Sequence, residues 1–301
     1  MDDQRLQRYL RAGRIAAQTI GYAESLLRSQ KNLSYYDLCE KVEGFIEGKG
    51  GIPAFPCNVG VNEVTAHFSP LTREEGTLPE EGLVKVDVGV RIDGCIVDTA
   101  TTVPLSPEFR SIVEVNKFVL EEAIKLMRPG EKTGRIGGVI EAVAKARNYK
   151  TIRNLSGHLI SEYSLHGGKA IPNVGRPFTP KMKADEIYAV EPFLTFPNAH
   201  GEVVDTDKHQ IFQIVKLKRP GDRDQANLYD HIVKRYDRLP FSPRWLRDLM
   251  PMPRLLEVLE VMRKGGILHA YPILVEKSGK PVAQFEHTVV VREEGPLILT
   301  E

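Results

Sequence analysis

The sequence has little cysteine. Cys39, Cys57 and Cys95 are the three among 301 residues, they lie far apart, and none forms a CxxC pair. An odd, scattered set favours free thiols in a reducing compartment over disulfides or a zinc knuckle. Runs of about 18 apolar residues, which a membrane-spanning helix needs, are also missing. The chain begins Met-Asp-Asp-Gln, not with a basic and then apolar signal. We therefore expect a cytoplasmic protein with no membrane partner.

An excess of charge of either sign is missing as well. Lys and Arg number 41 against 40 Asp and Glu, a formal net charge of +1. This balance argues against wholesale binding to nucleic acid, and no sequence-specific nucleic-acid contact is expected. Gly167-Gly168-Lys169 lacks the earlier glycine that a phosphate-binding loop needs. The composition, 42% hydrophobic and 27% charged, is that of an ordinary folded protein.

Two stretches about 100 residues apart share one order of elements. Apolar residues at helical spacing predict a helix over Asp3–Arg28 and a second over Ser34–Gly48, with Ser34 as its N-cap. A long helix is predicted over Ser106–Met127, a break at Pro129-Gly130, and another helix after Thr133. Strands follow each pair of helices. The pattern predicts an α+β protein made of two pseudo-symmetric helix–helix–strand halves around an antiparallel sheet, with a site at their junction.

The segment of residues 209–268 departs from this pattern, because it is rich in charge and proline. It is predicted to be a mostly helical insertion, with helices over Leu228–Arg238, Trp245–Leu249 and Leu255–Met262. Strand character resumes at Leu268. A continuous strand is predicted over 284–291, where β-branched and aromatic residues are frequent.

Two aspartates lie close together on a predicted hairpin. Asp93-Gly94 between two alternating apolar runs is a strong signal for a two-residue turn. That turn places Asp87 opposite Ala100, so Asp98 lies diagonally from Asp87 on the same face, about 7–8 Å away along the backbone. The two carboxylates are either exposed surface groups or a pair that holds a metal, since like charges repel and are costly when desolvated.

Three further residues carry suitable ligand chemistry. His158 follows a short apolar run and Gly157, Glu191 ends an apolar strand before Pro192, and Glu286 lies inside the predicted strand over 284–291. Taken singly, His158 fits a structural or exposed role better than a ligand role, and Glu286 fits a solvated face as well as a bound group. Carboxylates together with histidine suit Mn, Fe, Co or Zn.

Taken together, the order of these five residues resembles the pita-bread metallopeptidases, and the local motifs are most similar to the methionine aminopeptidases. The matching segments are Val86–Gly89, Gly94–Asp98, Ser156–His158, Leu165–Lys169, Val190–Pro192 and Ala283–His287. The insertion before residues 268–272 resembles that of the type II enzymes, in a short form without an N-terminal extension. The resemblance spans nearly the whole chain and implies a pita-bread fold in which residues 1–301 form one catalytic domain, with the insertion at about 209–268.

The resemblance also implies roles for individual residues. Asp87, Asp98, His158, Glu191 and Glu286 would hold two divalent cations. Glu191 would carry the proton from the attacking water to the leaving amine. The family's two active-site histidines match His67 and His166. The residues that would bind the substrate are His67, His166, Phe55, His209 and Tyr271.

The implied function is removal of N-terminal methionine from nascent proteins whose second residue is small and uncharged. A proline-specific peptidase of the prolidase or aminopeptidase P type, or a nonenzymatic binding protein with the same fold, are the alternatives. Residues 216–264 contain twelve basic and seven acidic residues. This local excess predicts either weak, salt-sensitive docking to the ribosome or a solvated helical face that walls the substrate pocket.

Overall fold

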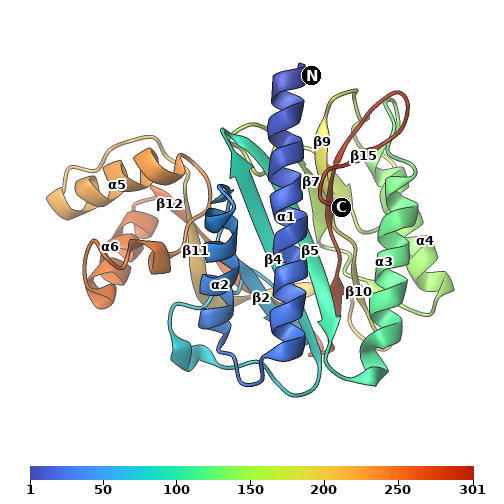
Figure 1. The fold of residues 1–301 in the computed structure, drawn as a ribbon, viewed down its shortest axis with the longest axis horizontal. Coiled ribbons are helices and arrows are strands. Elements are labelled where there is room, and N and C mark those ends of the chain that lie inside the picture. The colour runs from blue at the N-terminus through green and yellow to red at the C-terminus, as the bar shows by residue number, and fades with distance from the viewer.

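The computed structural model describes all residues from 1 to 301, and its helices lie close to the predicted positions (Figure 1). Ser34 caps the second helix as expected, because its hydroxyl accepts the Asp37 N–H at 3.0 Å. The third begins later than predicted, since Pro107–Phe109 form a 3₁₀ turn, and it ends before Met127. The helices are α1 (Asp3–Ser29), α2 (Tyr35–Gly48), α3 (Arg110–Ile124), α4 (Thr133–Ala146), α5 (Arg223–Tyr236) and α6 (Met252–Lys264).

Every strand pair is antiparallel, as predicted. The four sheets have the orders β1-β4-β2 with β5 beside β4, β13-β10-β6, β11-β12-β3, and β15-β14-β9-β7-β8. The strands are β1 (Ile52–Pro53), β2 (Asn58–Val61), β3 (Val64–Ala66), β4 (Leu83–Ile92), β5 (Cys95–Pro104), β6 (Lys150–Thr151), β7 (Ser156–Ile160), β8 (Ala170–Pro172), β9 (Ile187–Val190), β10 (Phe193–Thr195), β11 (Val203–Ile214), β12 (Leu268–Glu276), β13 (Val282–Gln284), β14 (His287–Val290) and β15 (Leu297–Ile298).

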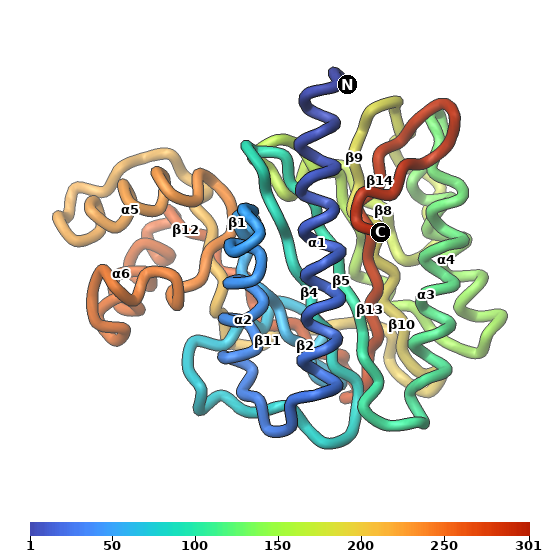
Figure 2. Tube along the Cα trace, viewed as in Figure 1, coloured from blue at the N-terminus to red at the C-terminus, as the bar shows by residue number.

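The two helix pairs cover the same side of the sheets, one pair on each half (Figure 1). Apolar residues of α1 and α2 pack on β4 and β5 in one core, and those of α3 and α4 pack on β9, β10 and β13 in a second. The C-terminal segment lies against α1 (Figure 2), where a Cβ at Gly13 would be 1.9 Å from the Leu299 carbonyl oxygen.

The aspartate hairpin has the predicted register. Ile92 pairs with Cys95 and Asp87 with Ala100 along β4 and β5. The turn residues Asp93 and Gly94 have φ values of 46° and 83°, the left-handed region that a two-residue hairpin turn of this type requires. A Cβ at Gly89, two residues after Asp87, would lie 2.3 Å from the Phe55 ring, so this glycine makes room for that ring.

Two predicted boundaries are wrong. β11 continues to Ile214, so residues 209–214, predicted to open the insertion, are strand, and the helical part begins at Arg223. Residues 284–291 do not form one strand, because Gln284 ends β13, His287 begins β14, and Glu286 lies in the break between two sheets.

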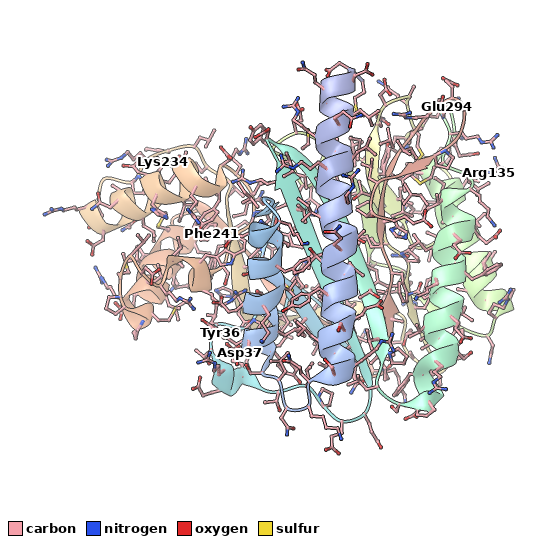
Figure 3. All side chains as sticks on the ribbon, in the orientation of Figure 1. Tyr36, Asp37, Arg135, Lys234, Phe241 and Glu294 are labelled. Carbon is pink, nitrogen blue, oxygen red and sulfur yellow. The ribbon has the colours of Figure 1, made fainter.

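The insertion is anchored to the rest of the chain through buried polar contacts. Its Phe241 (Figure 3) pairs its backbone with Phe212 of β11. The fully buried Arg244 donates to both carboxylate oxygens of Glu43 on α2, at 2.7 and 2.8 Å, and to the Pro70 carbonyl at 3.1 Å. A buried, bidentate ion pair of this kind fixes orientation strongly. No helix in the structure is both long and apolar enough to cross a bilayer.

Candidate metal centre and substrate pocket

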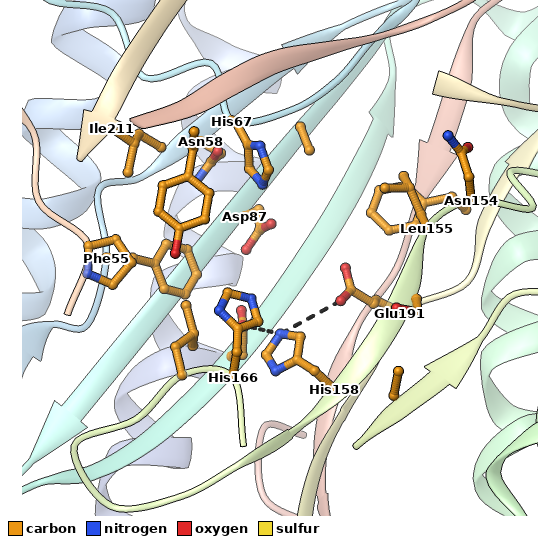
Figure 4. Close-up of a pocket in the computed structure, with 18 of the residues that line it drawn as sticks. Phe55, Asn58, His67, Asp87, Asn154, Leu155, His158, His166, Glu191 and Ile211 are labelled. Carbon is orange, nitrogen blue, oxygen red and sulfur yellow. Dashed lines mark ion pairs between the residues drawn. The ribbon is translucent and has the colours of Figure 1, made fainter. Parts of the chain in front are cut away.

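A pocket of about 400 Å³ opens on the face of β4 and β5 away from α1 (Figure 4). Val86 and Val88 belong to the core under α1, and alternation along the strand turns Asp87 to the opposite face. The residues that line the pocket come from both halves of the chain and from the insertion, which contributes Pro240. The junction of the two halves is therefore where the cavity lies, as the sequence pattern predicts.

Four of the five predicted ligands line this pocket, and the fifth, Glu286, lies beside Asp98 and His158. Asp87 is on β4, Asp98 on β5, His158 on β7, Glu191 directly after β9, and Glu286 between β13 and β14. One ligand atom from each of Asp98, His158 and Glu286 lies within 4.8 Å of the others. The Nε2 atom of His158 is 3.5 Å from an Asp98 carboxylate oxygen and 3.7 Å from one of Glu191 (Figure 4).

Two further contacts hold this cluster together. The amide nitrogen of Gln284 donates to Asp87 at 3.2 Å and to Glu286 at 3.4 Å. A Cβ at Gly157 would lie 2.3 Å from the Ala189 carbonyl oxygen, so only glycine lets β7 approach β9 closely beside His158. Gln284, which ends β13 two residues before Glu286, was not among the predicted site residues.

The electrostatics of the cluster are unfavourable without a cation. Burial and mutual repulsion raise the pKa values of Asp87, Glu191 and Glu286 well above normal, and burial raises the pKa of Asp98 to about 7. Asp98 is 4% exposed and Glu286 2%, so the reading of Asp98 as an exposed surface charge is wrong.

Several buried atoms of the cluster also lack a hydrogen-bond partner. They are one oxygen each of Asp87, Asp98 and Glu286, and Nδ1 of His158. Buried polar atoms are rarely left unpaired, and an ion is one of the explanations for such a group. Carboxylate oxygens with a neutral imidazole suit a divalent first-row cation, and burial lowers the pKa of His158 to about 4, which keeps the ring neutral. The residues therefore fit a metal site.

This arrangement predicts that metal affinity rises with pH. In the metal-free protein the raised pKa values favour protonated carboxyl groups, among them Asp98 with a pKa of about 7, and a cation must displace these protons. His158, whose pKa is about 4, contributes no proton near neutrality. We expect the affinity for Mn²⁺ to rise roughly tenfold per pH unit for each proton released, as the pH rises towards the Asp98 pKa of about 7. Calorimetric titrations in buffers of different ionisation enthalpy count the protons, and a pH-independent affinity would contradict the assignment of buried acids as ligands.

The two predicted active-site histidines lie at the pocket. His67 follows β3 with φ of 66°, and its Nδ1 is 3.0 Å from the Pro272 carbonyl oxygen. The His166 ring centroid is 4.5 Å from that of His158. Burial lowers the pKa of both His67 and His166 to about 4, so both rings are neutral. A non-glycine residue in the left-handed region is a form of backbone strain that concentrates at functional sites.

The apolar part of the pocket differs partly from the prediction. Phe55 and Tyr271 line it as expected, and Leu165 and Ile211 were not foreseen. His209 is not among the lining residues, and its ring lies near Glu260 of α6, with Nε2 3.7 Å from that carboxylate. The β11–β12 register shifts between His209 and Ile211, and a bulge of this kind changes which residues face the pocket.

The chain matches the model of metallopeptidase family M24 over residues 7–293. It therefore belongs to metallopeptidase family M24, and the fold and the Asp–His–Glu cluster are those of a hydrolase of this family.

Archaeal methionine aminopeptidases are 32–41% identical to the chain over nearly its full length. The one from Saccharolobus solfataricus is 39% identical and covers 100% of this chain and 99% of its own. The resemblance read from the sequence is thereby confirmed.

Solved structures confirm the pita-bread fold. A methionine aminopeptidase from Thermotoga maritima superimposes with a TM-score of 0.72 at 21% identity, over 100% of this chain and 98% of that one. A thermophilic Arx1 superimposes with a TM-score of 0.86 at 16% identity, over 99% and 91%. At these identities the likeness concerns the fold alone.

Proposed function

We propose that the cluster holds two divalent cations and that the protein uses them to remove the N-terminal methionine from polypeptides. The ligands are Asp87, Asp98, His158, Glu191 and Glu286, and the metals that suit them are Co, Mn, Fe or Zn. The observation that carries the proposal is a cluster of four carboxyl groups and one neutral imidazole, in which buried oxygen atoms are left unpaired. Four carboxylates offer more ligand atoms than one cation uses, which favours a pair.

The family and the named relatives support the substrate class. The pocket agrees with it, because Phe55, Leu165 and Ile211 form an apolar wall beside the metal ligands. Such a wall suits the flexible, apolar thioether side chain of methionine. A cytoplasmic location, where nascent chains are processed, is part of the same proposal.

The chain's own residues supply positioning and proton transfer. When bound, the cations lower the pKa of water and stabilise negative charge on the substrate. Glu191 takes the proton of the attacking water and delivers it to the leaving amine. Since a carbonyl only accepts, Nδ1 of His67 is the donor to Pro272, and the neutral ring leaves Nε2 as an acceptor. His67 therefore suits the substrate amide N–H, and His166 is the histidine free to donate to the carbonyl oxygen.

Substrate preference is expected to depend on the second residue. The Tyr271 ring lies 5.2 Å from that of His67 and 6.4 Å from that of His166, so little room is left past the scissile bond. We expect kcat/KM for Met-Ala-Ser to exceed that for Met-Leu-Ser by about 10²-fold, equivalent to roughly 2.7 kcal/mol. Comparable values would contradict the steric argument. Preference for Xaa-Pro peptides would favour the prolidase alternative, and no turnover by the metal-loaded protein would favour the nonenzymatic one.

We also propose weak docking of the insertion to the ribosome. Part of its basic excess is neutralised in ion pairs, such as Arg219–Asp230 and Arg254–Asp224. Lys216, Lys218 and Lys234 are among the exposed cations of the insertion that form no ion pair (Lys234 is labelled in Figure 3), and such cations are available to RNA phosphates. The contact of the insertion with α2 and the pocket supports the alternative, a purely structural wall.

Reversal of these three charges tests the docking. We expect Lys216→Glu, Lys218→Glu and Lys234→Glu together to abolish co-sedimentation with ribosomes at low salt, and moderate salt to do the same for the unmodified protein. Lys145→Glu, an exposed lysine on α4 at the far end of the molecule (Figure 1), is the control and leaves binding unchanged. Absence of binding at low salt, or binding that survives the triple reversal, would rule the docking out.

A further inference from the structure

The metal-binding cluster straddles a seam between strands that do not form a regular ladder. Asp98 lies on β5 in one sheet, whereas His158 and Glu191 lie on or next to strands of the sheet that contains β14. β5 runs beside β13 and β14 (Figure 2), yet the backbone hydrogen bond across the seam is a single one, from Glu286 N–H to the Ala100 carbonyl at 3.2 Å. Something other than ladder pairing must therefore fix the width of this seam.

Threonine hydroxyl groups take the place of the missing ladder. The Thr288 hydroxyl donates to the Asp98 carbonyl at 2.7 Å and accepts the Asp98 N–H at 2.6 Å. The Thr102 hydroxyl makes the same pair of bonds with Gln284, at 2.6 and 2.8 Å. The Thr99 hydroxyl donates to the Glu286 carbonyl at 2.8 Å. All three threonines are at most 2% exposed.

These contacts are made to the backbone of the metal-binding residues themselves. Thr288 satisfies both main-chain groups of Asp98, Thr99 bonds Glu286, and Thr102 holds Gln284, whose amide contacts Asp87 and Glu286. Strands in a ladder lie about 4.7–4.9 Å apart. A hydroxyl between two backbones imposes a different, fixed spacing, because it is covalently attached to one of them. The spacing in turn sets the 3.5 Å separation between the Asp98 carboxylate and His158.

We propose that Thr288, Thr99 and Thr102 are positioning residues that set the geometry of the metal centre across this seam. The inference rests on the proposed function of Asp98 and Glu286 as ligands. Thr288 is the member with the largest effect, since it bonds both main-chain groups of Asp98. Partners that orient metal ligands in this way typically change metal affinity by about 10–100-fold when they are removed.

The chain offers a matched control on the same strand. Thr101 of β5 is as buried as Thr99, at 2% exposure, but its hydroxyl donates to the Glu24 carboxylate on α1 at 2.7 Å, on the side away from the metal centre. Thr101→Val therefore removes a buried threonine hydrogen bond without touching the seam. Thr288→Ser retains the hydroxyl of Thr288 and loses only its methyl group.

The experiment is calorimetric titration of the metal-free full-length variants with Mn²⁺, together with thermal unfolding of each. We expect Thr288→Val to bind Mn²⁺ at least about 10-fold more weakly, Thr288→Ser to stay within about 3-fold of the unmodified protein, and Thr101→Val to lose stability but keep its affinity. Unchanged affinity in Thr288→Val, or an equal loss in Thr101→Val, would overturn the proposal. If Thr288→Val does not fold, Thr99→Val, which removes a single donor, gives the same readout.

Asp98→Asn separates this proposal from the one on which it rests. Loss of Mn²⁺ binding in Asp98→Asn with unchanged affinity in Thr288→Val would overturn the role of the seam and leave the ligand assignment intact. Unchanged Mn²⁺ binding in Asp98→Asn would overturn the ligand assignment, and the seam proposal with it.

Discussion

Exhaustive chelation is expected to abolish peptidase activity, and added Co²⁺ or Mn²⁺ to restore it. The acids of the cluster have no other cation to balance them, and three of them have a buried oxygen without a hydrogen-bond partner. A bound cation contributes several kcal/mol of charge stabilisation in the transition state. Because each 1.36 kcal/mol is a factor of ten in rate, we expect a loss of about 10³-fold or more. Release of methionine from Met-Ala-Ser is the measurement.

Two controls make the chelation result specific. Circular dichroism must show that the metal-free protein keeps its fold, because unfolding alone would also stop turnover. Mg²⁺, which prefers oxygen ligands and retains its water, should restore activity poorly at a site that contains His158. Full activity after complete chelation, verified by metal analysis, would contradict the metal-dependent mechanism and leave only the fold.

The hairpin could be predicted in detail from the sequence because its information is local. Asp93-Gly94 specifies the turn, and the turn specifies the register in which Asp87 faces Ala100. The signal that predicts Ser34 as an N-cap is also local, since a hydroxyl residue just before a helical apolar pattern can accept a hydrogen bond from the first N–H groups of the helix. These features depend on neighbours in sequence, and the structure agrees with them.

Strand boundaries that depend on pairing with distant strands were not predicted from the sequence. Residues 284–291 have the composition of one strand, yet the chain leaves the sheet with β10 after Gln284 and enters the sheet with β9 at His287. Strand propensity does not encode a change of sheet. Likewise, the charged residues before Ile211 do not have the composition of a strand, so β11 was not predicted. In the structure it is a strand because it pairs with β12.

For the candidate site, the sequence predicted which residues could be metal ligands, but it did not predict all the residues that line the pocket. The five candidate ligands were predicted as a set through the resemblance to the pita-bread metallopeptidases, since His158 and Glu286 taken singly fit other roles, and the structure brings the five together. His209 is not among the residues that line the pocket, whereas Ile211 is, and the β11–β12 register shifts by one residue between the two. The seam threonines carry no signal of their own, and neither does the contact of Gln284 with Asp87, since these contacts join residues far apart in sequence.

Glu191→Gln is expected to lower kcat by about 10²–10⁴-fold while changing KM little. The amide keeps the shape of the side chain and one ligand oxygen but cannot accept a proton, and loss of general acid–base catalysis has this magnitude. Steady-state kinetics on Met-Ala-Ser, with metal content measured for each preparation, give the result. Glu202→Gln is the matched control, because Glu202 pairs with Arg153 away from the pocket lining, and its kcat should not change. An unchanged kcat in Glu191→Gln at full metal content would assign proton transfer to another group, whereas a lost metal ion that excess Mn²⁺ restores together with activity would leave Glu191 as a ligand alone.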